Sequence, residues 1–178
     1  TKEPESAAET HGKFDLGRQC LLARRLLESD ISFVQVSHSN YDTHAENFNY
    51  HIKLLGEFDQ SFSALIDDLA ERGMLESTLV IVYSEMGRTP KINTKYGRDH
   101  WGTAWSIALG GCGIQPGAVI GKTNAEGTAV TDREVDAGHL FHTYLQAVGL
   151  DSFSNHDLPG RTIPIGDPAT EPIKELLS

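Results

Sequence analysis

The stretch "STLVIVYSE", residues 77–85, decides the expected fold. Its centre is a run of Leu, Val and Ile without a Gly or Pro, which is typical of a strand buried on both faces. Strands of this kind belong to parallel sheets that helices cover on both sides. Two further segments are rich in β-branched and aromatic residues and predict strands as well: "ISFVQVSH" (31–38) and "TAWSIALGG" (103–111).

The segments between these strands predict helices. Apolar residues at helical spacing predict one helix over residues 16–27, with Arg24 and Arg25 facing outward, and a long one from Ala45 to Arg72. The segment "DAGHLFHTYLQAVGL" (136–150) predicts a last helix. The polar residues 1–15 are expected to fray or to wrap around a neighbouring element. A short strand is expected at 118–121.

Alternation of strands and helices predicts an α/β fold with a mainly parallel sheet flanked by helices. The length of 178 residues fits a single domain over residues 1–178, in which 1–14 and 151–178 are peripheral segments. No apolar run approaches the length of a membrane span. The net charge of -10 argues against a nucleic-acid surface, because such a surface needs clustered Lys and Arg.

Chemically active side chains stand at the ends of the predicted strands: Asp42 with His44, Glu85 with Arg88, and Arg98 with Asp99 and His100. Ligands of open parallel sheets gather at the carboxyl ends of strands. Carboxylates with imidazoles are ligands of zinc, manganese and similar divalent ions. Each group taken alone also fits a hydrogen-bonded loop. Their placement at successive strand ends favours a metal site.

Arg88 and Arg98 have two open interpretations. Each can form an ion pair with a loop carboxylate, or it can bind a phosphate or sulfate, whose geometry suits the guanidinium group. For His51, a place in the core or on the surface is favoured. His139 and His142 lie at i, i+3 on the last predicted helix, where packing is favoured over metal binding.

The motifs "YDTH", "EMGRTP" and "GRDHW" follow one another in this order. With their flanking segments they resemble a sulfatase-like family of unknown function in the alkaline phosphatase superfamily, over almost the whole chain. The resemblance implies a partial alkaline phosphatase-like core and a divalent metal, namely zinc, manganese or calcium. It implies hydrolysis of small sulfuric or phosphoric esters, with Arg88 and Arg98 binding the substrate. The implied metal ligands are Asp42, His44, Glu85, Asp99 and His100.

The chain departs from this family pattern in two ways. Met86 stands where a second ligand is expected, and a thioether is a poor ligand for a hard ion. The early metal aspartate and the nucleophile of the family's N-terminal half are missing, so the chain is expected to be a C-terminal portion without hydrolase activity of its own. It is expected to form homo-oligomers or to need the missing half. The family also implies a periplasmic or secreted protein.

Two alternatives to a hydrolase remain open. One is a non-catalytic α/β module that binds a metal or a protein partner. The other is a relative of the phosphomutases, which share the metal ligands of the hydrolases but transfer phosphate within one substrate.

Overall fold

The computed structural model describes residues 5–177, so residues 1–4 and 178 of the predicted peripheral segments lie outside the described residues. The contacts divide the chain into two compact units. The first unit holds Thr1–Met74 and Lys91–Asp99, and the second holds Leu75–Pro90 and His100–Ser178. The prediction of a single domain stays a prediction, and each unit is described separately.

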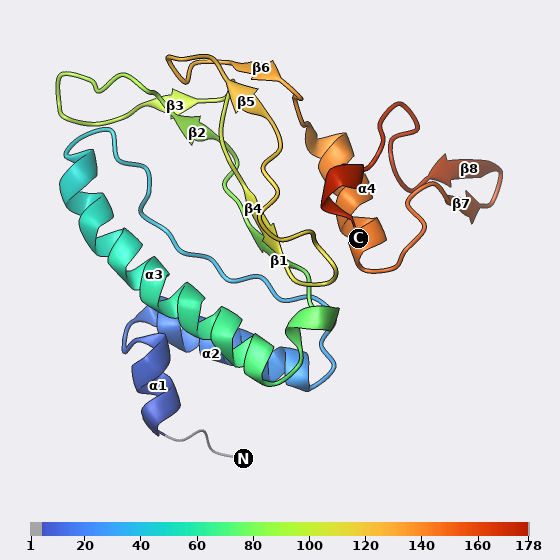
Figure 1. The fold of residues 1–178 in the computed structure, drawn as a ribbon, viewed down its shortest axis with the longest axis horizontal. Coiled ribbons are helices and arrows are strands. Elements are labelled where there is room, and N and C mark those ends of the chain that lie inside the picture. The colour runs from blue at the N-terminus through green and yellow to red at the C-terminus, as the bar shows by residue number, and fades with distance from the viewer. Residues whose placement is uncertain (1–4, 178) are drawn as a thin grey trace. The chain divides into compact units, whose positions relative to one another are not determined.

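The first unit is built from three helices: α1 (Glu5–His11), α2 (Asp15–Glu28) and α3 (Asn47–Glu71) (Figure 1). The two helices predicted from apolar periodicity are confirmed as α2 and α3. Their buried apolar faces are formed by Leu16, Cys20, Ala23, Leu54, Ala64 and Leu69. In the segment predicted to fray or to wrap around a neighbouring element, residues 5–11 are helical. This helix buries His11, so α1 packs against the other two helices.

A network of ion pairs joins α2 to α3. Arg24 was predicted to face outward, which is wrong, because only 1% of its surface is exposed. Its Nε donates to Asp68 at 2.8 Å, and its Nη1 donates to Glu28 at 2.6 Å. Arg72 donates to the same two carboxylates, at 2.6 and 2.7 Å. A guanidinium group is buried at tolerable cost only when it is paired and hydrogen-bonded, so each partner in this network depends on the others.

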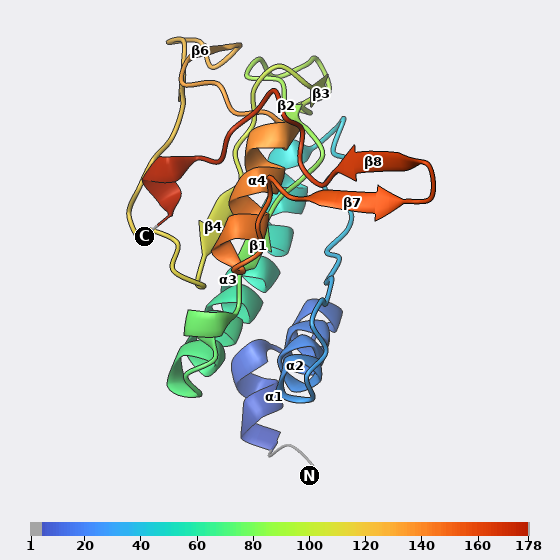
Figure 2. The same cartoon turned by 90° about the vertical axis from the view of Figure 1, so that its right-hand side faces the viewer.

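The second unit contains short strands and one helix, α4 (Ala137–Ala147) (Figures 1 and 2). Its two-stranded ladders are β1 (Val80–Val82) with β4 (Ala108–Gly110), β2 (Gly87–Arg88) with β3 (His100–Trp101), β5 (Lys122–Thr123) with β6 (Val130–Asp132), and β7 (Asn155–Leu158) with β8 (Arg161–Pro164). Every one of these ladders is antiparallel. Two single 3₁₀ turns complete the unit, at Leu75–Ser77 and Lys174–Leu176.

The predicted fold class is therefore wrong. The described residues form no mainly parallel sheet and no alkaline phosphatase-like core. The stretch 77–85 supplies only β1, which is half-buried and pairs antiparallel with β4. Residues 33–43 form no strand, and Phe33 is 80% exposed. The physical reason is that a β-branched run indicates a fit to a pleated surface, while a strand needs a second backbone to complete its hydrogen bonds.

The predicted strand at 118–121 is also displaced, because β5 begins at Lys122. The predicted last helix is confirmed as α4. Its N-terminus is a capping box, in which Asp136 accepts a hydrogen bond from the backbone N–H of His139 at 3.0 Å. His142 packs as expected: it is fully buried, and its ring nitrogens contact Ser152 Oγ at 2.7 Å and the Asp167 carbonyl at 2.9 Å.

Within residues 5–177, none of the helices combines the length and apolar character that a membrane crossing requires.

We predict that Asp68→Asn lowers the free energy of unfolding by about 3 kcal/mol at neutral pH, because it leaves the buried Arg24 without its counter-charge. Burial alone raises the pKa of Asp68, but hydrogen bonds from Arg72 and Arg24 outweigh it and hold this pKa below the usual value. A depressed folded-state pKa stabilises the fold above about pH 4, and this contribution is lost as the pH falls through the folded value.

Urea unfolding as a function of pH measures both effects. The parent protein should lose stability below about pH 4 more steeply than Asp68→Asn does. The control is Asp67→Asn, since Asp67 is an exposed neighbour on the same helix. Equal stabilities of Asp68→Asn and this control at neutral pH would contradict the prediction.

Candidate metal centre

The loop 91–99 caps the start of α3 (Figure 1). The first N–H groups of a helix have no acceptor within the helix, and Glu46 at the N-cap makes no side-chain hydrogen bond there. Carbonyl groups of the loop take this role: Lys95 accepts from the Glu46 N–H and Tyr96 from the Asn47 N–H, both at 3.0 Å. In addition, the Arg98 N–H donates to the Thr43 carbonyl at 3.1 Å. These bonds bring "YDTH" and "GRDH" together.

Asn93 and Gly97 lie where the loop 91–99 comes closest to the backbone of His44. The Asn93 amide nitrogen donates to the His44 carbonyl at 3.0 Å and to Asp99 Oδ1 at 3.2 Å. A Cβ atom on Gly97 would lie 2.0 Å from the His44 carbonyl carbon and oxygen, so a side chain cannot be accommodated without a backbone shift. Asn and Gly are common in turns, so the sequence indicates a tight loop here. It did not predict a part in the site for Asn93 or Gly97.

His44 lies between two carboxylates. Its Nδ1 is 2.7 Å from Asp99 Oδ1, and its Nε2 is 3.0 Å from Asp42 Oδ1. Thr43 between Asp42 and His44 is buried, and its hydroxyl donates to Asn47 Oδ1 at 2.7 Å. The alternation of exposed, buried and exposed residues leaves both possible ligands on the solvent side.

One donor atom from each of Asp42, His44 and His100 lies within 4.8 Å of the others, which makes these residues a possible metal-binding group. Asp42 and His44 belong to the first unit, and His100 is the first residue of the second segment, His100–Ser178, of the second unit.

The donor set fits a divalent ion. Ligands bound at about 2.0–2.2 Å in tetrahedral geometry lie about 3.3–3.6 Å apart, close to the 3.0 Å between His44 Nε2 and Asp42 Oδ1. All three residues are exposed, so three protein ligands leave coordination positions open to water or substrate.

The other predicted site residues have different positions. Glu85 follows β1, is exposed, and is not part of the group formed by Asp42, His44 and His100. Arg88 lies directly opposite His100 in the β2–β3 ladder. The Arg98 guanidinium lies 5.9 Å from the centre of the Phe48 ring, within the range of a cation–π contact.

Met86 and His51 make contacts of their own. Met86, at an expected ligand position, accepts a hydrogen bond from Ser84 Oγ through its carbonyl oxygen. His51 contacts Thr43 Oγ1 at 3.2 Å, and its ring meets the Tyr41 ring edge-on.

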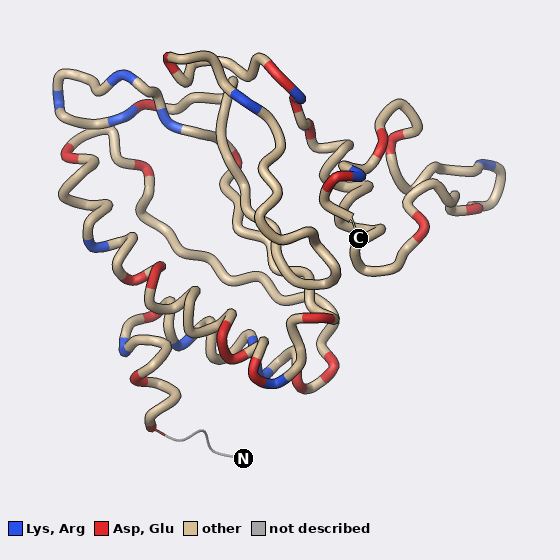
Figure 3. The backbone as a smooth tube through the Cα atoms, in the orientation of Figure 1, with Lys and Arg blue, Asp and Glu red and all other residues tan. Residues whose placement is uncertain are grey.

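Positive charge accumulates on the loop of this site. Lys91, Lys95 and Arg98 are three of the chain's 15 basic residues and fall within eight positions. Figure 3 shows them as blue segments along the loop between β2 and β3. A local cluster of one sign produces a local potential that the net charge of the whole chain does not describe.

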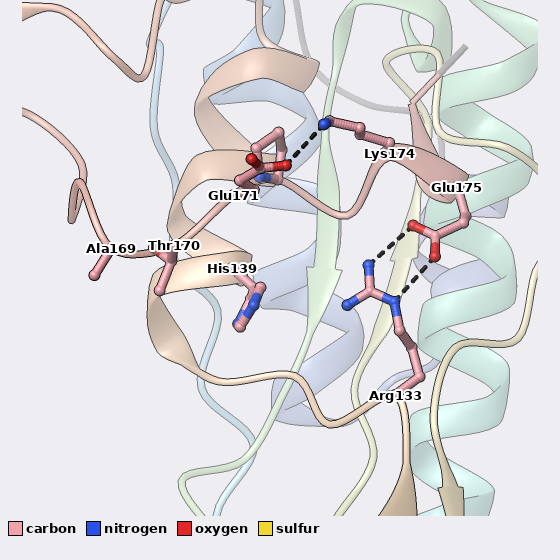
Figure 4. Close-up of a pocket in the computed structure, with 8 residues that line it drawn as sticks. Arg133, His139, Ala169, Thr170, Glu171, Lys174 and Glu175 are labelled. Atoms are coloured by element: carbon pink, nitrogen blue, oxygen red, sulfur yellow. Dashed lines mark hydrogen bonds and ion pairs between the residues drawn. The ribbon is translucent and has the colours of Figure 1, made fainter.

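The second unit contains a separate hollow of about 440 Å³ (Figure 4). Its lining charges neutralise one another: Arg133 donates two hydrogen bonds of 3.0 Å to Glu175, and Lys174 donates one of 2.7 Å to Glu171. The hydrogen bond from Arg133 lowers the pKa of Glu175 to about 2. A ligand here would have to displace existing ion pairs, so we place the candidate site at the metal-binding group instead.

A family described as "Protein of unknown function (DUF1501)" matches residues 1–177. No curated protein and no solved structure matches the chain.

We predict that Gly97→Ala lowers the free energy of unfolding by about 2–4 kcal/mol, because its Cβ would overlap the His44 carbonyl. The matched control is Gly56→Ala within α3, where no heavy atom lies within 4 Å of the added Cβ. That control should stabilise the protein by about 0.5–1 kcal/mol through helix propensity. Thermal or urea unfolding of both variants makes the comparison. Equal stabilities of the two variants would show that the close contact at Gly97 is not important.

Proposed function

The chain belongs to the DUF1501 family, and from this premise we propose that it is a divalent-metal-binding protein whose ligands are Asp42, His44 and His100. The observation that carries the proposal is the approach of three donor atoms to within 4.8 Å of one another. Two of these donors come from one turn, and the third, His100, is the first residue of β3. The residues Asp42 and His44 thus lie beside the contact that orders the start of α3.

We propose zinc or manganese as the ion. Imidazole suits zinc and other transition metals, whereas calcium prefers six to eight oxygen ligands. A site of two imidazoles and one carboxylate offers calcium too few oxygens, so calcium is the least suited of the ions that the sequence analysis allowed. Iron(II) is a further candidate, because two histidines with one carboxylate also form the ligand set of non-haem iron sites.

The reaction that we propose is hydrolysis of a small phosphate or sulfate ester. A divalent ion, when bound, supplies Lewis-acid polarisation of an ester oxygen. The chain itself supplies Arg88 opposite His100 and the basic residues of the loop, which can bind the oxyanion and offset negative charge that develops on it. The proposal of an ester substrate rests on this positive charge beside the donor group.

A non-catalytic metal-binding module is the second candidate, and one observation favours it. Thr43 is the hydroxyl residue between two of the proposed ligands, yet it is buried and hydrogen-bonded to Asn47. This hydroxyl is therefore not presented for attack on an ester. A module of this kind would bind the ion and the anion without turnover.

Metal titration of chelator-treated protein tests the first part of the proposal. We expect one equivalent of zinc or manganese to bind in isothermal titration calorimetry. His100→Ala and Asp42→Asn should weaken binding by more than about 100-fold, because loss of an outer-shell partner already costs about 10–100-fold. Asp67→Asn, an exposed position of α3 about 30 Å along the helix from its start, is the control. Absence of binding to the parent protein would refute the metal centre.

Hydrolysis of p-nitrophenyl phosphate and p-nitrophenyl sulfate by the metal-loaded protein tests the second part. If an ester is the substrate, Arg98→Gln should lower kcat/KM on the order of 100-fold, because it removes a charged donor for the oxyanion. Lys95→Gln alters the same net charge at a neighbouring loop position and should have a smaller effect. Stoichiometric metal binding with no turnover of either ester would favour the non-catalytic module.

A further inference from the structure

We infer that residues 32–38 are an open strand edge at which a second copy of this chain adds its own residues 32–38 in antiparallel direction. The inference is independent of the proposed metal centre and concerns the first unit alone. It rests on the backbone of this segment, on its lack of acidic and basic side chains, and on the symmetry of its sequence about Gln35.

The backbone of residues 32–40 makes no backbone–backbone hydrogen bond to any of the described residues. The neighbouring bonds lie just outside this range: the Ile31 N–H donates to the Leu26 carbonyl, and the Thr43 N–H donates to the Tyr41 carbonyl. A row of unpaired N–H and C=O groups is a template for pairing with another strand. The segment therefore has the backbone of a sheet edge and lacks only a partner among the described residues.

The segment is held extended along α3. Glu28, at the end of α2, is ion-paired with Arg72 beyond the C-terminal end of α3, so the chain must return over the length of that helix to begin it at Asn47. A helix of 25 residues is about 37 Å long. His38 Nε2 lies 3.4 Å from Glu57 Oε2 of α3, and Figure 1 shows the segment beside this helix. A strand that is ordered beforehand loses less entropy on pairing.

The side chains of the segment alternate between two faces, as in a strand. Val34 and Val36 are half-buried. Phe33, Gln35 and Ser37 are exposed, Phe33 at 80%. A partner strand must keep half-buried residues opposite half-buried residues, because a shift of the register by one residue exchanges the two faces.

Two features indicate a second copy as the partner. Residues 31–41 contain no Asp, Glu, Lys or Arg although the net charge is -10, so two copies can meet here without placing like charges opposite each other. The sequence is also symmetric about Gln35, with Val34 before it and Val36 after it. Antiparallel pairing about a two-fold axis at Gln35 sets each Val34 opposite the partner's Val36, on the same face. Such β-branched side chains pack well on a pleated surface.

Charges introduced at Gln35 test this pairing. Gln35→Lys and Gln35→Glu each place two like charges directly opposite each other, so each variant alone should dimerise about two- to five-fold more weakly than the parent protein. An equimolar mixture of the two variants places opposite charges there and should restore dimerisation. Sedimentation velocity over a range of protein concentrations measures the dissociation constant. Gln19→Lys, at an exposed position of α2, is the matched control and should dimerise like the parent protein.

Hydrogen exchange locates the interface. The amides of residues 32–38 of the parent protein should exchange more slowly as the protein concentration rises, and those of Gln35→Lys should slow less over the same range. The urea midpoints of Gln35→Lys and Gln19→Lys should agree, which shows that the variant is folded.

Four results would overturn the inference. A protein that stays monomeric at the highest concentration has no such partner. A dimer that Gln35→Lys weakens no more than Gln19→Lys does is formed through another surface. If the mixture of Gln35→Lys and Gln35→Glu dimerises no better than either variant alone, the two Gln35 side chains do not face each other. Slow exchange of the 32–38 amides in a monomer means that the same chain covers the segment.

Discussion

The capping of α3 by the loop 91–99 is the interaction on which the candidate site depends. α3 begins after a residue in left-handed conformation and without a capping side chain, so its first N–H groups need acceptors from elsewhere. The carbonyls of Lys95 and Tyr96 provide them. Once the loop is held there, Asp99 and His100 follow within a few residues. A requirement of the helix N-terminus thus brings together His44 and Asp99, which are 55 positions apart in the chain.

The net charge of -10 does not indicate where charges gather in this protein, and two local clusters of charged residues stand out. In one, a buried arginine and its carboxylate partners join α2 to α3, where each charge is compensated by hydrogen bonds. In the other, basic residues gather on the loop 91–99, which also carries Asp99, one of the predicted ligands. The first cluster joins two helices of the first unit, and the second lies on the loop that caps α3.

Sequence patterns predicted the helices well because helical periodicity is local: α2 and α3 each repeat their apolar face over several turns. The strands could not be predicted in this way, since strand formation depends on a distant partner, and 31–38 lacks one among the described residues. The prediction that Arg24 faces outward was wrong for a related reason. Asp68, the partner that makes the burial of Arg24 possible, is 44 positions away in the chain.

The convergence of "YDTH" and "GRDH" was anticipated for a reason that proved incorrect. The expected cause was a shared edge of a parallel sheet, and the observed cause is a loop bonded to a helix start. Asn93 was overlooked because its role exists only through contacts across this fold.

The one-residue spacing within Asp-Thr-His has a physical basis of its own. Thr43 is anchored inward by its hydrogen bond to Asn47, and the Arg98 N–H holds its carbonyl, so the residue between the two ligands cannot rotate outward. Its neighbours must then both face solvent. Exposed ligands bind an ion tightly only if little order is gained on binding, since the entropy of fixing side chains opposes it. The buried threonine on one side and the carboxylate of Asp99 on the other therefore restrict the His44 side chain before any ligand is bound.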